Sequence, residues 1–177
     1  MFLAEPSLLG IIDSYGIELI HPIRKGRNPK GWVESGISNH RWIVGGKLCL
    51  SVNSLGQIIG WAWATANAHD SWFHPIIEAF KDKSVIFTDT GFHAKEGDPP
   101  NMKVCRRGEW NDRMLIETIN SMLTVVCHAK KMRHQVADYF KTHLGYMVAA
   151  FNTLIAWSGL LPDDNGFVHL SIAEFNL

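Results

Sequence analysis

The first segment of the chain combines an alternating pattern with one charge that does not fit it. From position 9 to position 19 the alternate residues are apolar or aromatic with a single exception: Leu9, Ile11, Asp13, Tyr15, Ile17 and Leu19. Successive strand side chains point to opposite faces, so these six share one face. The other face is half apolar, and residues 8–20 are therefore predicted to form a strand covered on both sides. An ionised carboxylate there costs several kcal/mol unless it is paired or bound to a metal, which makes Asp13 a candidate functional residue.

Further along, short apolar runs separated by turn residues predict strands, and longer helical periods predict helices. The predicted strands are 47–53 and 58–65, which form a hairpin around the turn 54–57, and then 84–89 and 102–105. The predicted helices are 70–82, with Asp70 or Ser71 as N-cap, then about 110–131 and about 132–160. Three meandering strands followed by alternating helices and strands indicate a single α/β domain over residues 1–177, with a mixed sheet flanked by helices.

Charge adds one local feature. The 17 acidic and 17 basic residues cancel, so the net charge indicates no polyanionic partner and local clusters must be considered instead. The predicted loop at about 21–46 is rich in glycine and carries one acid, Glu34, against five bases: Arg24, Lys25, Arg27, Lys30 and Arg41. These bases either stay solvated or hold nucleic-acid phosphates. Trp32 and Trp42 in the same loop either pack in the core or stack on unpaired bases.

Cysteine content and hydropathy bear on where the chain acts. The three cysteines are far apart, which argues against a disulfide scaffold and indicates a reducing compartment. The N-terminus lacks the basic start and small-residue cleavage site of a signal peptide. Residues 144–161 are uncharged and just reach the length of a membrane span. Their two-faced pattern, which includes the polar Asn152, favours a buried helix that packs in the core or at an interface.

Three carboxylates stand at positions where α/β proteins build sites. Asp13 lies within a strand, Asp89 ends the strand 84–89, and Glu117 lies in a helix one turn after Arg113. Each has a plain alternative, namely a structural buried acid for Asp13, an Asx-type turn for Asp89, and a solvated pairing with Arg113 for Glu117. Brought together at one end of the sheet, the three would suit two Mg²⁺ or Mn²⁺ ions, which bind oxygen ligands and activate water for phosphodiester cleavage.

The phrases around these acids resemble a known family. The segments 11-IIDS-14, 67-NAHD-70, 88-TDTGF-92 and 113-RMLIETINSML-123 resemble those of bacterial insertion-sequence DDE transposases, and the resemblance extends over about residues 8–157. It implies a ribonuclease H-like mixed β-sheet flanked by helices. It also implies that Asp13, Asp89 and Glu117 are catalytic and bind the metal, and that Arg113 orients Glu117 or contacts phosphate.

The resemblance also implies partners. The chain would cut and join double-stranded DNA at element ends and at a target, using two Mg²⁺ (or Mn²⁺) ions. It would act as a homodimer or higher oligomer on DNA in the bacterial cytoplasm, at the nucleoid, with no membrane partner. Where some relatives have a tyrosine and a lysine near the third acid, this chain has Trp110 and Thr124. DNA contacts would come from the basic loop and from bases further along: Arg24, Lys25, Arg27, Lys30, Arg41, Lys130, Lys131 and Arg133.

Full-length relatives usually carry an N-terminal helical DNA-binding region, whereas this chain begins almost at its first predicted strand, so it is expected to be a catalytic core. Two alternatives stay open. One is a ribonuclease H-like nuclease that cleaves nucleic acid and never joins it. The other is an inactive truncated remnant that serves only as a DNA-binding or interaction module.

Overall fold

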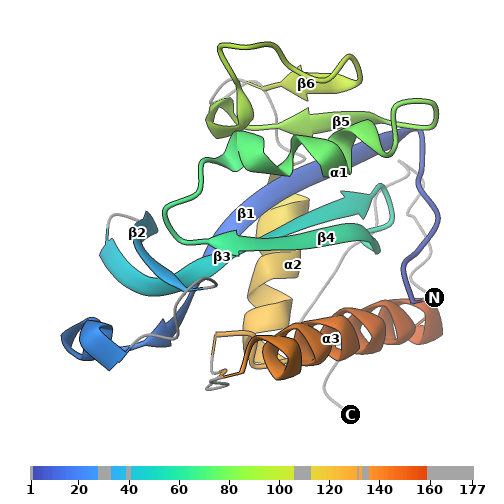
Figure 1. Ribbon diagram of the computed structural model, residues 1–177. Coiled ribbons are helices and arrows are strands. Elements are labelled where there is room, and N and C mark those ends of the chain that lie inside the picture. The colour runs from blue at the N-terminus through green and yellow to red at the C-terminus, as the bar shows by residue number, and fades with distance from the viewer. Residues whose placement is uncertain are drawn as a thin grey trace.

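The structure, a computed structural model, describes residues 2–27, 33–38, 41–105, 113–130, 132 and 136–158 (Figure 1). In this part of the chain a mixed sheet has helices on both faces, as the apolar pattern predicts. Its six strands are β1 (Leu9–Ile20), β2 (Glu34–Ser38), β3 (Arg41–Asn53), β4 (Ile58–Thr65), β5 (Val85–Thr88) and β6 (Met102–Val104). The α-helices are α1 (His74–Glu78), α2 (Arg113–Val125) and α3 (Ala137–Ser158), and the 3₁₀ helices are η1 (Pro22–Arg27), η2 (Asp70–Phe73) and η3 (Thr90–Phe92).

Strand β1 is the centre of the sheet, where an antiparallel half meets a parallel half. On one side β3 runs antiparallel to β1, and β2 and β4 pair one after the other with the far edge of β3. On the other side β5 and then β6 run parallel to β1. The parallel half is short, because β5 pairs with β1 only from Leu9 to Ile11. Beyond that point β1 continues past the end of β5, which opens one edge of the sheet.

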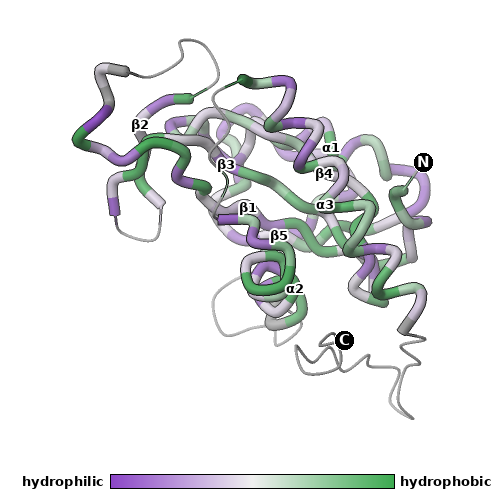
Figure 2. The backbone as a smooth tube through the Cα atoms, turned by 90° about the horizontal axis from the view of Figure 1, so that it is seen from below, coloured by the Kyte–Doolittle hydropathy of each residue, from purple (hydrophilic) through white to green (hydrophobic). Residues whose placement is uncertain are grey.

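Both faces of β1 are covered, as its sequence predicts. On one face Tyr15 and Ile17 belong to a large apolar cluster with α2 and α3, in which Ile119 and Phe140 are fully buried. On the other face Ile12 belongs to a smaller cluster with α1, η2, η3 and β5. Each fully buried side chain of this size stabilises the fold by about 1.5–3 kcal/mol. Figure 2 shows the long hydrophobic stretches of β3 and α2 that this burial requires.

The predicted loop 21–46 holds more regular structure than its sequence indicates. It contains the 3₁₀ helix η1, the strand β2 and the first residues of β3, which begins at Arg41 rather than at Lys47. In β2 the buried position is Gly36, whereas Ile37 is 57% exposed. A Cβ atom at Gly36 would clash with the backbone of Ala66, so only glycine fits there. The apolar pattern missed this strand because its inward residue has no side chain.

Two predicted helices also have different limits. The segment 70–82 is a 3₁₀ turn followed by a five-residue α1, and its N-cap is His69, whose ring accepts a hydrogen bond from the Ser71 amide. The prediction that Asp70 or Ser71 is the N-cap is therefore wrong. Helix α2 ends at Val125 rather than at Lys131, because His128 adopts a positive φ of 52° and the Ala129 amide donates back to the Leu123 carbonyl.

Helix α3 packs into the core, as the two-faced pattern of residues 144–161 predicts. Its apolar stripe is buried: Leu144, Met147, Val148, Phe151 and Ile155. Asn152 is also buried and bonds both the amide and the carbonyl of Ile58, which ties α3 to the start of β4. Within the described ranges, no helix is both long enough and apolar enough to cross a membrane.

Candidate functional site

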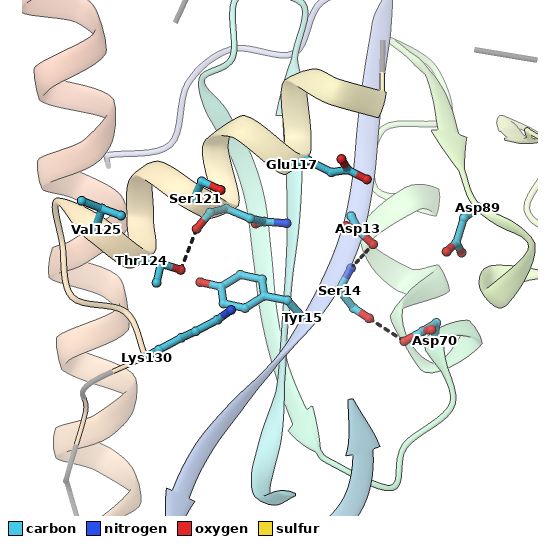
Figure 3. A pocket seen from close by; sticks show the side chains of 11 residues that line it. Asp13, Ser14, Tyr15, Asp70, Asp89, Glu117, Ser121, Thr124, Val125 and Lys130 are labelled. Carbon is cyan, nitrogen blue, oxygen red and sulfur yellow. Dashed lines mark hydrogen bonds between the residues drawn. The ribbon is translucent and has the colours of Figure 1, made fainter. Parts of the chain in front are cut away.

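A pocket lies where β1 passes the end of β5. Its volume is about 460 Å³. Side chains from both faces of the sheet line it, because β5 no longer covers the edge of β1 at this point. The side chains that line it are Asp13, Ser14, Tyr15, Asp70, Asp89, Glu117, Asn120, Ser121, Thr124, Val125 and Lys130 (Figure 3). The structure therefore places the three predicted acids together, with a fourth carboxylate from Asp70.

Asp13 is half-buried and is not enclosed in the dry core. Alternation places it on the same face as Tyr15, toward α2, but at its level the sheet edge has opened into the pocket. Its Oδ1 accepts a hydrogen bond of 2.8 Å from the Ser14 amide. In Figure 3 the Asp13 carboxylate stands between those of Glu117 and Asp89. The charge that seemed misplaced within the strand pattern is thus at a solvent-accessible site.

Asp89 comes directly after β5, at the carboxyl end of a parallel strand. Its Oδ1 accepts a 2.8 Å hydrogen bond from the Gly91 amide, which caps η3. The Asx-type turn that the sequence offered as an alternative is therefore present. Asp89 also lines the pocket, so the same turn that satisfies one carboxylate oxygen fixes the position of the whole group.

Glu117 is an exposed residue of α2 whose side chain points into the pocket opposite Asp13 (Figure 3). Its neighbours Ile116 and Ile119 are fully buried beneath it, so the packed face of the helix sets the direction of Glu117. Arg113 is the first residue of α2, but its side chain lies outside the described residues. Its pairing with Glu117 stays a prediction.

The sequence predicts the fourth carboxylate, Asp70, as a possible helix cap and places it within the family-like phrase 67-NAHD-70, but assigns it no role in the site. Its Oδ1 accepts hydrogen bonds from the Ser14 hydroxyl at 2.6 Å and from the Lys47 ammonium at 2.9 Å. Its Oδ2 and Asp89 Oδ1 each lie 3.0 Å from the point where a Gly91 Cβ would stand, so the two carboxylates approach each other over that glycine. The sequence signal that could have identified Asp70 was its position just beyond β4 in the phrase 67-NAHD-70.

The described residues that line the second half of the pocket are mostly polar, and none of them is an acid. The Tyr15 hydroxyl and Asn120 Oδ1 are buried, and each is without a hydrogen-bond partner in the described structure. Burial, with a smaller effect from Cys127, raises the pKa of Tyr15 well above its usual range, so its phenol stays protonated. The Lys130 ammonium lies 5.8 Å from the centre of the Tyr15 ring. This half therefore offers hydrogen-bonding groups and one cation.

The predicted DNA-binding residues fall into three groups. Lys130 lines the pocket. Arg24 in η1 and Arg41 at the start of β3 are exposed at the opposite end of β1 from β5, so the structure does not bring them to the pocket (Figure 1). Arg41 lies 4.0 Å from Glu18. The others lie outside the described residues, as whole residues or as side chains: Lys25, Arg27, Lys30, Lys131 and Arg133.

The donor set of the pocket suits a hard divalent cation, because carboxylate oxygens are the ligands that Mg²⁺ and Mn²⁺ prefer. Among the described residues, no three acidic, histidine or cysteine side chains are placed to surround a single ion. Mg²⁺ is usually bound by one or two carboxylates, with water and substrate phosphate completing its octahedron. The chemistry of these carboxylates therefore suits a divalent cation held by one or two acids, with the rest of its ligands from water and substrate.

Comparisons with protein-family models, with curated proteins and with solved structures give no match to this chain.

Proposed function

We propose that the chain is the catalytic domain of a DDE transposase with a ribonuclease H-like fold, which cleaves and joins double-stranded DNA with the help of two divalent cations. The observation that carries the proposal is the pocket itself. Three acids from a strand, from a strand end and from a helix line one opening at the edge of a mixed sheet: Asp13, Asp89 and Glu117.

The order of the strands supports this assignment. An antiparallel set formed by β1, β3 and β4 is followed by the parallel strands β5 and β6, with Asp13 on the first strand and Asp89 at the end of β5. Glu117 follows on α2, which packs against β1. This is the order and the structural context of the three acids in the family that the sequence resembles.

Asp13, Asp89 and Glu117 would hold the cations, with the Asp13 carboxylate between the other two in the pocket (Figure 3). When bound, the cations would activate water or a 3′-hydroxyl for in-line attack and stabilise the leaving oxygen. Asp89 is held for this role by its bond to the Gly91 amide, and Glu117 by the packed face of α2. The protein thus contributes a preset arrangement of negative charge.

The acid-free half of the pocket would receive the DNA strand beside the scissile bond. Lys130 supplies a cation for a phosphate, and the Tyr15 hydroxyl and Asn120 Oδ1 are hydrogen-bonding atoms without a partner among the described residues. Arg24 and Arg41 would contact phosphates further along the duplex. The end of the sheet that carries these arginines would then bind DNA, and the pocket at the other end would cleave it. In the family, transposases work on paired ends, so we expect a homodimer or larger assembly on DNA.

The proposal is tested by Mn²⁺- or Mg²⁺-dependent nicking of a supercoiled plasmid. Asp13→Asn and Glu117→Gln should each lower the nicking rate by at least about a thousandfold, because each removes a charge that holds the cations. Asp82→Asn, an equivalent change at an exposed aspartate after α1, should leave the rate unchanged. Undiminished nicking by the Asp13 variant would show that the acids are not catalytic.

A second assay separates transposition from hydrolysis. DNA carrying the ends that flank the coding sequence should be cleaved and then joined to a target plasmid. Cleavage without any joined product would assign a nuclease instead of a transposase. A folded protein that neither cleaves DNA nor binds Mn²⁺ would be a non-catalytic module.

A further inference from the structure

The ion pair between Lys47 and Asp70 is a charged element beside the metal-binding acids that the proposed function does not use. Lys47 is on β3, Asp70 begins η2, and their Nζ and Oδ1 atoms are 2.9 Å apart. The two side chains are only 17% and 22% exposed, so water screens this pair less than a surface pair. A half-buried ion pair next to a cation site therefore affects the electrostatic potential of that site.

The geometry assigns different positions to the two partners. Asp70 lines the pocket, whereas Lys47 is not among the described residues that do so. Lys47 lies on the opposite face of the sheet from Asp13, since it pairs with Gly16 and shares a face with Ser14 and Cys49. Asp70 therefore stands between the lysine ammonium and the acids of the pocket, and its Oδ1 binds both Lys47 and the Ser14 hydroxyl.

The charges involved are close together. Burial raises the pKa of the Cys49 thiol, the negative charges of Asp13 and Asp70 raise it further, and Lys47 lowers it. Ser14 links two of these groups directly, because its amide donates to Asp13 and its hydroxyl donates to Asp70. Asp70 itself lines the pocket, so an ammonium released from it would stay near the pocket carboxylates and would compete there with a divalent cation.

We propose that the Lys47–Asp70 pair sets the divalent-cation affinity of the pocket, with Asp70 as a positioning residue that anchors the ammonium outside the pocket and keeps it from the metal-binding acids. This inference rests on the proposed function, because it assumes that Asp13 and its neighbours bind cations. It assigns a role to two residues that do not themselves hold the metal.

The test compares four proteins, namely the wild type, Lys47→Met, Asp70→Asn and the double variant, which together form a charge cycle. Each is titrated with Mn²⁺ alone, and the free ion is quantified by electron paramagnetic resonance. Lys47→Met leaves Asp70 unneutralised and should tighten Mn²⁺ binding by about tenfold. Asp70→Asn frees the ammonium and should weaken it by about tenfold or more. The double variant has the net charge of the wild type and should return close to wild-type affinity.

Controls separate this effect from damage to the fold. Lys81→Met and Asp82→Asn make the same charge changes at exposed positions and should leave the Mn²⁺ affinity unchanged. If the ion pair were purely structural, both single variants would have a lower thermal unfolding midpoint, but their Mn²⁺ affinities would not change in opposite directions. Should Asp70→Asn fail to fold, tighter binding by Lys47→Met still supports the inference, and unchanged binding overturns it.

The outcomes also distinguish the two proposals. If the wild type does not bind Mn²⁺, or if Asp13→Asn binds it equally well, the proposed function fails and the inference fails with it. If Asp13→Asn abolishes binding while the four members of the charge cycle bind alike, only the role of the Lys47–Asp70 pair is wrong.

Discussion

The two sides of the pocket hold their acids in different ways. On the α2 side, Asp13 and Glu117 belong to a twelve-residue strand and a thirteen-residue helix, both packed on the larger core. On the α1 side, Asp70 and Asp89 lie at the starts of short 3₁₀ turns and are held by individual hydrogen bonds. Regular structure fixes the first pair through many apolar contacts, whereas a few polar contacts fix the second.

This difference determines what a substitution on each side of the pocket should do to the protein. A change in the packing under α2 should damage the whole domain, because that core also holds β1, β3 and α3 together. A change in a polar contact on the α1 side should move one carboxylate while the domain stays folded. Four substitutions test this contrast.

Leu123→Ala should have the largest effect, on the α2 side. Leu123 is fully buried in the larger core, so its truncation leaves a cavity and should lower the free energy of unfolding by about 2–5 kcal/mol. Urea denaturation measures the loss. The nearby exposed Val125 provides a control, since Val125→Ala should change stability by less than about 0.5 kcal/mol. Equal losses for the two variants would contradict the packing described for α2.

Gly91→Ala should act on the α1 side without unfolding the protein. The added methyl group would stand 3.0 Å from Asp70 Oδ2 and from Asp89 Oδ1, so both carboxylates must shift. We expect Mn²⁺ affinity to fall by about tenfold, equivalent to about 1.4 kcal/mol, with little change in the denaturation midpoint. Gly145→Ala is the control, because its methyl group would meet Trp61 at an ordinary 3.9 Å. Wild-type affinity in Gly91→Ala would show that the positions of these two carboxylates do not affect cation binding.

His74→Phe should have a smaller effect on the same side. The His74 ring donates from Nε2 to the Phe92 carbonyl at 2.7 Å, which holds the turn that Asp89 begins. Phenylalanine keeps the ring but loses this bond, so the free energy of unfolding should fall by about 1 kcal/mol. Calorimetry measures this loss, and Mn²⁺ titration should show a few-fold weaker affinity. An unaltered unfolding temperature would mean that the bond does not hold the turn.

Asp98→Asn should have the smallest effect, and it should depend on pH. Hydrogen bonds from the Ala94 amide and, to a smaller extent, from His93 lower the pKa of Asp98 below its usual 3.8. A lowered pKa in the folded state stabilises the protein at pH values above 3.8, and this contribution is lost as the pH falls through the lowered pKa. The variant should therefore melt slightly below the wild type at pH 7, and thermal scans at falling pH should show this difference shrinking below pH 3.8 as Asp98 becomes protonated. A difference that does not change with pH would rule out this origin.

Much of the fold follows from the sequence, because apolar periodicity records which faces are buried. Strands β1, β4, β5 and β6 and the cores of α2 and α3 lie where the pattern predicts them. The prediction was wrong at two elements, where contacts that apolar periodicity does not record set the local structure. Strand β2 buries Gly36 instead of its isoleucine, and the start of the predicted helix 70–82 is a 3₁₀ turn capped by His69.

The sequence by itself determined which chemistry the chain can carry: Asp13 within an apolar strand, Asp89 at a strand end, and Glu117 on an amphipathic helix. Only the tertiary structure decided that these acids line one pocket, that Asp70 joins them, and that Lys47 is bound to Asp70 outside it. The physical reason is the short parallel half of the sheet. Periodicity indicates which face of an element is buried. It does not indicate that β5 ends beside Asp13, so that side chains from both faces of β1 line one pocket.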